Sequence, residues 1–442
     1  MFKEKIILKN QSLHISFLFF LLAFVSSVVN ASEYNQSYYP RLANIQTVYV
    51  ETFNHEQITS KTEYKLCRFI LVSDTGTVKI DSVQIRGRGN ASWKFGKKPY
   101  RVKFPKRISL LGDEYAHARN WVLLSNGGDK LLIRNALANY VSRLCNMPFT
   151  PSGRFVDFYL NGEYLGNYQI TDFVDIEEER IDIDADGYLL EADGHTDAGK
   201  TYTKTPVFNN NIRIHYPEPE SITGSQIAYI KEHIGKFEEA LVGKGNFLNY
   251  VDSASLMGWY LTNEICANCD IFYQIYFYKQ KDDDRLYFSP VWDFDLGFNC
   301  DNRRGNSGDV SEYLMQDIEF EKKYIRNWFD SLKTTRWWKQ AQYEAYKHLY
   351  VERNLDSLMY AFVDSITSLI RPSVDKNYEK WNISECTHME YKLGGSYDEY
   401  LRDLFDFIRK HNAYIYDQFR NRYIGSMPPE IGQRMDESVG EN

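Results

Sequence analysis

The segment FVDFYLNGEYLGNYQI, residues 155–170, alternates apolar and polar side chains on both sides of Asn161-Gly162. Asn-Gly accepts the positive φ angles of a two-residue turn, so this segment predicts a β-hairpin. Short runs of the same kind, broken by Gly and Asn, lie before and after it, at 46–104, 120–124, 187–193 and 212–217. They predict a first half built mainly of strands.

One helix is predicted among these strands, over residues 130–144, where apolar side chains recur at helical spacing after Asp129 as N-cap. Beyond about residue 222 the helical period dominates. The exception is 271–298, which predicts two strands around the turn Asp282–Asp284, the second ending in carboxylates.

This order of elements predicts an α+β fold with two lobes. We expect a β-rich N-terminal lobe over about 40–220 and a mostly helical C-terminal lobe over about 221–425, with a cleft between them. We expect a loosely ordered tail over 426–442.

The composition predicts a packed protein. Of 442 residues, 43% are hydrophobic, 16% aromatic and 25% charged, which excludes a collagenous or mainly disordered chain. The formal net charge is −8 and no long Lys/Arg run is present, so we expect no nucleic-acid partner.

The first 31 residues have the features of a secretory signal peptide. Lys3, Lys5 and Lys9 precede the apolar stretch at 17–25, and Val29-Asn30-Ala31 places small residues at a cleavage site. An uncleaved signal anchor is the alternative. We expect cleavage after 1–31 and a secreted, periplasmic or cell-envelope protein without a membrane span in the mature chain.

Six cysteines lie in the mature chain, where an oxidising compartment permits disulfides. Cys266 and Cys269 are spaced as Cys-x-x-Cys, a pattern found in zinc and redox sites. A second such pair is absent from the sequence, so buried thiols or a structural bridge are the favoured interpretation.

The segment RGRGNASWKFGKKPYRVKF, residues 86–104, combines glycines with Arg86, Arg88 and Lys103. Glycine lets backbone N–H groups approach phosphate oxygens, and the cations balance phosphate charge. The segment therefore predicts a polyphosphate-binding turn, although Gly-x-Gly in a hairpin is also a common plain turn.

Carboxylates form the second candidate group. Asp293 and Asp295 lie in PVWDFDLGF among apolar residues, and Asp270 precedes them. Buried carboxylates need a compensating cation, and Mg²⁺ favours one or two of them together with substrate phosphates. We expect Asp293 and Asp295 to bind the metal and Asp270 to orient an acceptor hydroxyl, with helix caps or salt bridges as the alternative.

Two further polar residues are candidates for nucleotide binding. Glu191 lies in an otherwise apolar predicted strand, and Arg134 lies on the first-half helix, from which it could reach the cleft.

Together these segments resemble the CotH kinase family, which comprises secreted kinases of the spore-coat type. The resemblance extends over about 40–425 and rests on RGRGNASWKFGKKPYRVKF (86–104), NWVLLSNGGDKLLIRNALA (120–138), FYLNGEYLGNYQITDFVDIEEERI (158–181), GYLLEADG (187–194) and LYFSPVWDFDLGF (286–298). It implies a two-lobed atypical protein-kinase-like domain over 32–425. It also implies ATP bound between the lobes, Mg²⁺, and transfer of the γ-phosphoryl group to a protein hydroxyl.

The resemblance also implies roles for individual residues. Asp270 is similar to the family's catalytic-loop aspartate and Asp293 to its metal-binding aspartate, while Asp295 opens an Asp-Leu-Gly tripeptide like that of ordinary kinases. Ordinary kinases have an Asn five residues after the catalytic Asp, where this chain has Ile275, and no His-Arg-Asp triplet is present.

The sequence therefore supports an exported ATP- and Mg²⁺-dependent protein kinase acting on a protein substrate. The alternative is a noncatalytic kinase-like scaffold at the surface or envelope that binds a partner, a nucleotide or a glycan. A metal-dependent hydrolase that uses Asp270, Asp293 and Asp295 is a third possibility, which leaves the glycine–arginine segment without a role.

Overall fold

The computed structural model describes residues 39–193, 196, 199–303, 308–318 and 326–427. The chain divides into two units, Met1–Pro40 and Arg41–Asn442, and everything below concerns the second. The predicted signal peptide and residues 428–442 of the predicted tail lie outside the described residues. Among the helices of the described part, none is long and apolar enough to cross a membrane.

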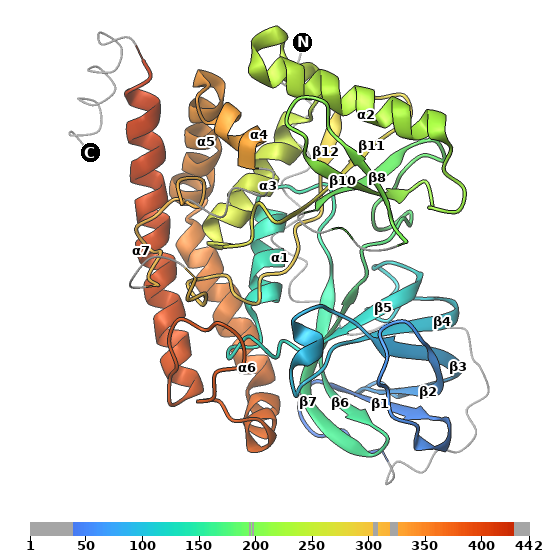
Figure 1. The fold of residues 1–442 in the computed structure, drawn as a ribbon. Coiled ribbons are helices and arrows are strands. Elements are labelled where there is room, and N and C mark those ends of the chain that lie inside the picture. The colour runs from blue at the N-terminus through green and yellow to red at the C-terminus, as the bar shows by residue number, and fades with distance from the viewer. Residues whose placement is uncertain (1–38, 194–195, 197–198, 304–307, 319–325, 428–442) are drawn as a thin grey trace. The chain divides into compact units, whose positions relative to one another are not determined.

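Seven strands close into a barrel, in the order β1-β2-β3-β4-β5-β7-β6 (Figure 1). They are β1 (Gln46–Thr52), β2 (Lys65–Val72), β3 (Thr77–Gly87), β4 (Tyr100–Ile108), β5 (Ala118–Leu124), β6 (Gly153–Leu160) and β7 (Glu163–Asp172). The neighbours are antiparallel except β1 and β6, whose parallel pairing closes the barrel. Its interior is filled by side chains such as Phe69, Val102, Trp121 and Phe158.

The β6–β7 hairpin confirms the prediction for residues 155–170. Asn161 and Gly162 take φ angles of 51° and 83°, the left-handed values that a type I′ turn requires. Their identity fixes the register in which Leu160 pairs with Glu163.

A second sheet has the order β12-β11-β8-β10-β9. Its strands are β8 (Tyr188–Asp193), β9 (Thr201–Lys204), β10 (Asn211–Tyr216), β11 (Gln274–Lys279) and β12 (Leu286–Phe288). Leu190, Ile212 and Phe277 on one face belong to the helical core, whereas Glu191 and Tyr276 point from the other face. Strands from both predicted lobes thus form a single sheet.

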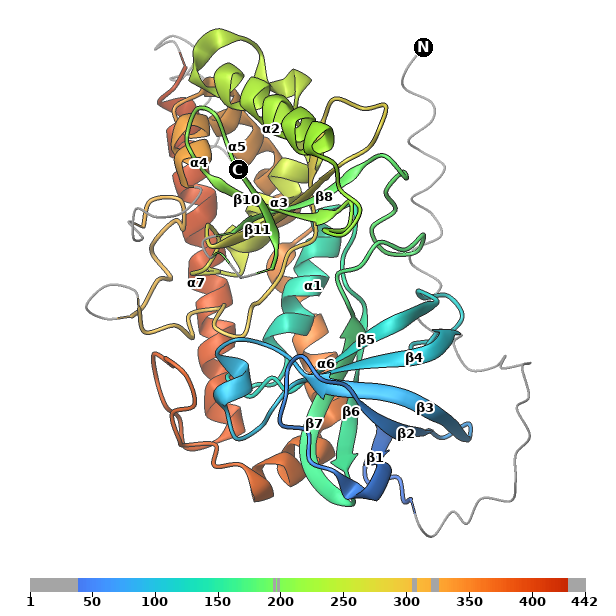
Figure 2. The same ribbon diagram turned by 45° about the vertical axis from the view of Figure 1, so that its right-hand side comes forward.

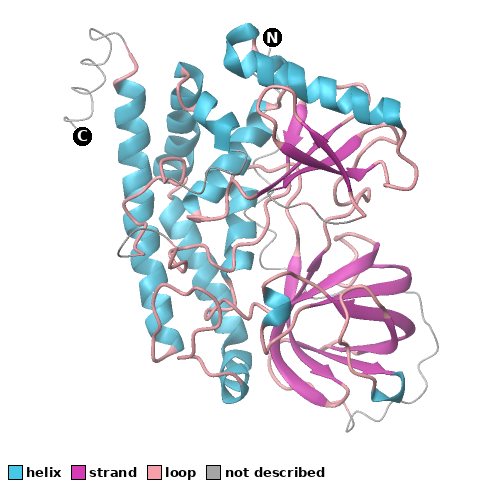
Figure 3. Cartoon of the chain, in the orientation of Figure 1, coloured by secondary structure: helices cyan, strands magenta, loops and turns pink. Residues whose placement is uncertain are grey.

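The helices gather beside the two sheets (Figure 3). They are α1 (Arg134–Leu144), α2 (Gly224–Glu239), α3 (Ser253–Ile265), α4 (Arg326–Leu332), α5 (Arg336–Lys347), α6 (Leu355–Lys380) and α7 (Tyr397–Ile424). Figures 1 and 2 show α2 over the second sheet, on the side away from the barrel. A β-rich N-terminal region followed by helices agrees with the α+β prediction, while the closed barrel goes beyond it.

The start of α1 differs from the prediction. The helix begins at Arg134, because Leu132 has a φ of 64° and interrupts the helical backbone. Asp129 is not the N-cap residue; its carboxylate accepts hydrogen bonds from the backbone N–H groups of Leu131 (2.9 Å) and Arg134 (2.7 Å). Asp129 therefore does bind the start of the helix, as predicted, but the N-cap position is occupied by Ile133.

A buried polar junction fixes α6 against the barrel. Asn167 on β7 donates its backbone N–H to Asn377 Oδ1 (3.1 Å) and its side-chain amide to Ser373 Oγ (2.8 Å). Ser373 in turn donates to Asp157 Oδ1 (2.6 Å). At Gly166, with a φ of 113°, a Cβ atom would lie 2.4 Å from Asn377 Oδ1, so glycine permits the close approach of the helix.

Candidate active site

Asp293 and Asp295 lie in the loop that follows β12, not at the end of the strand as predicted, because β12 ends at Phe288. Buried Phe294 anchors this loop between the two carboxylates, and its backbone N–H donates to Asn135 Oδ1 at 3.0 Å. Asp293 has a φ of 62°, which is uncommon for a residue with a Cβ atom. Such a held conformation is typical of functional sites.

Two charged residues from distant segments, Asp270 and Arg88, lie near enough to Asp293 to affect its pKa. Burial raises the pKa of its carboxyl, the negative charge of Asp270 raises it further, and the guanidinium of Arg88 opposes the shift. Asp293 is open to solvent, yet enough protein surrounds it to weaken its hydration. The structure thus brings Asp270, Asp293 and Arg88 into one electrostatic neighbourhood.

Asp295 belongs to the same neighbourhood. Burial raises its pKa to about 7, and the charge of Asp293 adds to the shift. Asn135 on α1 donates a side-chain hydrogen bond to Asp295 and Arg88 adds a positive charge, and both oppose it. The negative charges of two neighbouring, poorly hydrated carboxylates can be compensated by a divalent cation bound between them.

Asp270 lies in a turn after α3. Its backbone N–H donates to Asn268 Oδ1 (3.0 Å), and its carboxylate accepts from Arg303 Nη2 (2.9 Å). Arg303 is held in turn by Asp301, whose two carboxylate oxygens share the Nε–H of Arg303 at 2.9 Å and whose Oδ2 also accepts from its Nη2. The side chain of Asp270 is therefore held in place while it remains 39% exposed.

Arg88 projects from the turn after β3. Its guanidinium lies 5.2 Å from the ring centroid of Trp292, beside Asp293, and burial lowers its pKa. At Gly89, with a φ of 85°, a Cβ atom would lie 2.1 Å from Ser92 Oγ, so glycine is needed in this turn. No carboxylate among the described residues forms an ion pair with Arg88, which leaves its charge available to a bound anion.

The structure does not bring Arg86 and Lys103 to the carboxylates. Both project from the outer surface of the barrel, since the intervening residues of β3 and β4 face its core. Arg86 lies 5.0 Å from the ring centroid of Tyr64 and opposite Arg101, and Lys103 lies opposite Gln84. Within the described parts of the chain, neither side chain has an ion-pair partner.

Arg134 does not reach this cluster. Its guanidinium forms a buried ion pair with Asp129, and it lines a smaller cavity together with Asn299 and Cys300. The expectation that Arg134 faces the nucleotide cleft therefore needs correction, because its charge is already matched within the fold.

Glu191 lies on the second sheet, with a side chain 1% exposed. One carboxylate oxygen accepts from His215 (2.6 Å) and lies 3.6 Å from Arg213, while the other has no partner in the described structure. Tyr276 pairs with Glu191 across the sheet; burial raises the pKa of its phenol, Glu191 adds to this and Arg88 opposes it. Tyr276 thus links Glu191 electrostatically to Arg88.

Asn135, Arg303 and His388 were missed at the sequence level. Asn135 binds Asp295, Arg303 binds Asp270, and the charge of His388 lowers the pKa of Asp293. Each comes from a segment that is distant in sequence from the carboxylate it affects, so spacing gave no signal for any of them.

The residues present fit a magnesium–nucleotide pair better than a metal alone. No three His, Cys, Asp or Glu side chains of the described residues come together closely enough to hold a metal ion. Mg²⁺ is commonly held by one or two carboxylates, with substrate phosphates and water completing its shell. Asp293 and Asp295 would supply the carboxylates and Arg88 would face the phosphates.

The cysteines do not form a metal or redox site in this structure. All six are free thiols, and Cys266 and Cys269 are buried. Burial raises the pKa of the Cys266 thiol well above its usual value, which disfavours a reactive thiolate. The favoured interpretation of Cys-x-x-Cys as buried thiols agrees with this arrangement.

The candidate site thus combines Arg88, which follows a barrel strand, with carboxylates in loops beside the helical core. The chain belongs to the CotH kinase protein family, whose model matches residues 85–415. The match begins within β3, so β1 and β2 complete the barrel outside the matched range. Among curated proteins, none matches the chain.

Proposed function

We propose that this protein is an ATP- and Mg²⁺-dependent protein kinase, with an atypical two-lobed kinase fold, that phosphorylates a hydroxyl group of another protein. The observation that carries the proposal is the meeting of Arg88 from the barrel with Asp270 and Asp293 from the helical region. Family membership supports the same chemistry.

In this proposal Arg88 contacts the phosphate oxygens, while Arg86 and Lys103 attract the nucleotide from the same barrel surface. Asp293 and Asp295 hold Mg²⁺, which when bound offsets the charge of the phosphates. Glu191 would accept a hydrogen bond from the nucleotide with its free oxygen.

Asp270 orients the acceptor. Its exposed carboxylate accepts a hydrogen bond from the substrate hydroxyl and directs that oxygen toward the γ-phosphorus. As the new oxygen–phosphorus bond forms, the bond to the β-phosphate oxygen breaks, ADP leaves and the hydroxyl proton passes to Asp270.

Transfer from γ-labelled ATP tests this assignment, with autophosphorylation and a general acceptor protein as readouts. We expect Asp293→Asn and Asp270→Asn each to lower transfer by about 100-fold or more, because charge compensation and acceptor orientation are lost. Asp282→Asn, at an exposed turn residue, is the matched control and should retain wild-type transfer. Wild-type rates in both active-site variants would refute the proposal.

A noncatalytic nucleotide-binding scaffold is the second candidate, favoured by the ion pair between Asp270 and Arg303. It predicts that ATP with Mg²⁺ raises the melting temperature without any phosphoryl transfer. Transfer that depends on Asp270 excludes it.

We further propose that the protein acts after export, as a secreted, periplasmic or cell-envelope enzyme. Cleavage after Ala31 predicts a mature N-terminus at Ser32. N-terminal sequencing of the protein from the culture medium or envelope fraction tests this, and full-length chain confined to the cytosol contradicts it.

A further inference from the structure

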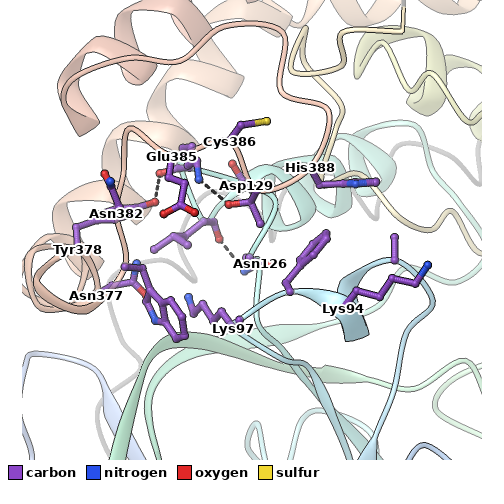
Figure 4. Close-up of a pocket in the computed structure, with 18 residues that line it drawn as sticks. Lys94, Lys97, Asn126, Asp129, Asn377, Tyr378, Asn382, Glu385, Cys386 and His388 are labelled. Atoms are coloured by element: carbon purple, nitrogen blue, oxygen red, sulfur yellow. Dashed lines mark hydrogen bonds between the residues drawn. The ribbon is translucent and has the colours of Figure 1, made fainter.

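A cavity of about 570 Å³ borders the proposed nucleotide site through His388, which lines the cavity and affects Asp293 (Figure 4). Its walls come from the segment after β3, the loop before α1, and the end of α6 with the loop that follows. None of the candidate residues Arg88, Asp270 and Asp293 lines it. Its volume is typical of sites for small molecules, which measure about 300–1,000 Å³.

Lys97 forms part of the cavity wall and is 5% exposed. Its Nζ donates to the backbone oxygen of Asn167 (2.6 Å) and lies 5.1 Å from the ring centroid of Tyr168. In the described part of the chain no carboxylate forms an ion pair with it. An ammonium group can donate three hydrogen bonds, so two of its donors have no acceptor among the residues that the structure describes.

Burial lowers the pKa of Lys97 to about 7. The carboxylates of Asp129, Asp157 and Asp295 oppose this shift, and Lys130 adds to it. The surrounding charges therefore compensate the buried ammonium only in part.

Asn377 supplies a second unused donor. The residue is 1% exposed, and its Oδ1 accepts from the backbone N–H of Asn167 (3.1 Å). Its amide nitrogen has no acceptor among the residues that the structure describes. Asn382 also lines the cavity but is exposed, and its side-chain oxygen accepts from the backbone N–H of Ser384 (2.9 Å).

The other buried charges of the cavity wall are already matched. Asp129 is paired with Arg134, and Lys130 lies 3.4 Å from Glu390. Glu385 also lines the cavity, and its solvent-exposed side chain points into it (Figure 4). The unused buried groups are thus N–H donors, which favour an anion.

Aromatic side chains form the remaining walls. Tyr378 and Trp381 come from the end of α6, and Phe95 comes from the segment between β3 and β4. His388 packs against Phe95 with ring centroids 5.3 Å apart. Flat, apolar walls of this kind suit the body of a planar ligand.

We propose that this cavity is a second small-molecule site, for a compound that joins a phosphate or carboxylate group to a flat apolar body. The anionic group accepts hydrogen bonds from Lys97 and Asn377, and the body packs between Trp381 and Phe95. This proposal is independent of phosphoryl transfer.

The cavity and the carboxylate cluster share a hydrogen-bonded link. Asn126, in the cavity wall, accepts from Asn135 Nδ2 (3.3 Å), and the same nitrogen donates to Asp295. A competition experiment must therefore establish that the cavity is not an extension of the nucleotide site.

Binding of phenyl phosphate and of benzoate, measured by calorimetry on the full chain, tests the proposal, with phenol as the uncharged probe. We expect saturable binding of at least one anion, little binding of phenol, and a loss of about 10-fold or more in Lys97→Met. Lys97→Met should fold, because it removes a poorly compensated buried charge at similar volume. Lys106→Met, at an exposed lysine of β4, is the control and should bind as the wild type does.

A second measurement uses the unaltered protein. Cys386 lines the cavity and is exposed, whereas the other five cysteines are buried. Phenyl phosphate or benzoate should slow alkylation of Cys386 by iodoacetamide.

Three results would overturn the proposal: no saturable binding of either anion, equal binding in Lys97→Met, or no protection of Cys386. Displacement of the bound anion by ATP with Mg²⁺ would also overturn it, because the cavity would then belong to the nucleotide site. None of these results depends on whether the protein transfers phosphate, so the two proposals fail separately.

Discussion

Asp293 combines a functional carboxylate with a left-handed backbone, at a φ of 62°. Asparagine tolerates this conformation better than alanine does, because its short polar side chain can hydrogen-bond locally. We predict that Asp293→Ala lowers the free energy of unfolding by about 1 kcal/mol more than Asp293→Asn. Urea denaturation of both variants measures the difference, and equal stabilities would show that the backbone at Asp293 is unstrained.

The sequence identified Asp270, Asp293 and Arg88 because each lies in a short segment whose composition suits phosphate or metal chemistry. Lys97 lies in one of these segments but was not singled out. Its importance comes from burial against β7 and α6, which no local pattern encodes. Arg134 was misjudged for the same reason, because Asp129 neutralises it in the folded chain.

At the scale of elements, α3 carries a buried acid whose ionisation should affect stability. Glu264 accepts hydrogen bonds from Tyr260 and from the backbone N–H of Met315 (2.6 Å), and burial raises its pKa to about 7 from a reference of 4.5. Between these values the folded state binds more protons than the unfolded state. Stability contributed by the neutral acid is therefore lost as pH rises toward 7.

We predict that Glu264→Gln reduces the loss of stability between pH 5 and pH 8 by about 1 kcal/mol or more, since glutamine stays neutral. Urea unfolding at the two pH values measures this difference. Glu232→Gln, on the exposed surface of α2, should leave the pH dependence of the wild type unchanged. An identical pH dependence in Glu264→Gln and wild type would contradict the role given to burial.

The junction between α6 and the barrel gives a second test at this scale. Ser373→Ala removes one of the two donors to Asp157 Oδ1 and leaves the buried side-chain amide of Asn167 without its acceptor, so we expect a loss of about 1–3 kcal/mol in the free energy of unfolding. Ser368→Ala, at an exposed position on the same helix, serves as the control in the same denaturation experiment. Equal effects of the two substitutions would argue against a structural role for the junction.

Elements defined by local chemistry were predictable, and pairings between distant segments were not. The β6–β7 hairpin follows from Asn161-Gly162, and most helices follow from their period. The parallel pairing of β1 with β6 and the union of β8 with β11 join strands distant in sequence, which alternation alone does not specify. The first turn of α1 was misplaced because the positive φ of Leu132 has no sequence signature.

For the whole molecule, two hydrophobic cores explain why the residues of the candidate site come from two parts of the fold. One core fills the barrel, and the other joins the second sheet to the helices. Arg88 follows a barrel strand, whereas Asp270 and Asp293 lie in loops next to elements of the second core. The sequence predicted this division between a β-rich and a helical part, although it did not predict the closure of the barrel.

ATP binding measured by calorimetry with and without Mg²⁺ tests the central claim most directly, since it asks whether Arg88, Asp293 and Asp295 form one site. We predict Mg²⁺-dependent binding to the wild type, loss of that dependence in Asp293→Asn, and affinity lowered by about 10-fold in Arg88→Gln. Binding of ATP with Mg²⁺ to both variants at wild-type affinity would contradict the account.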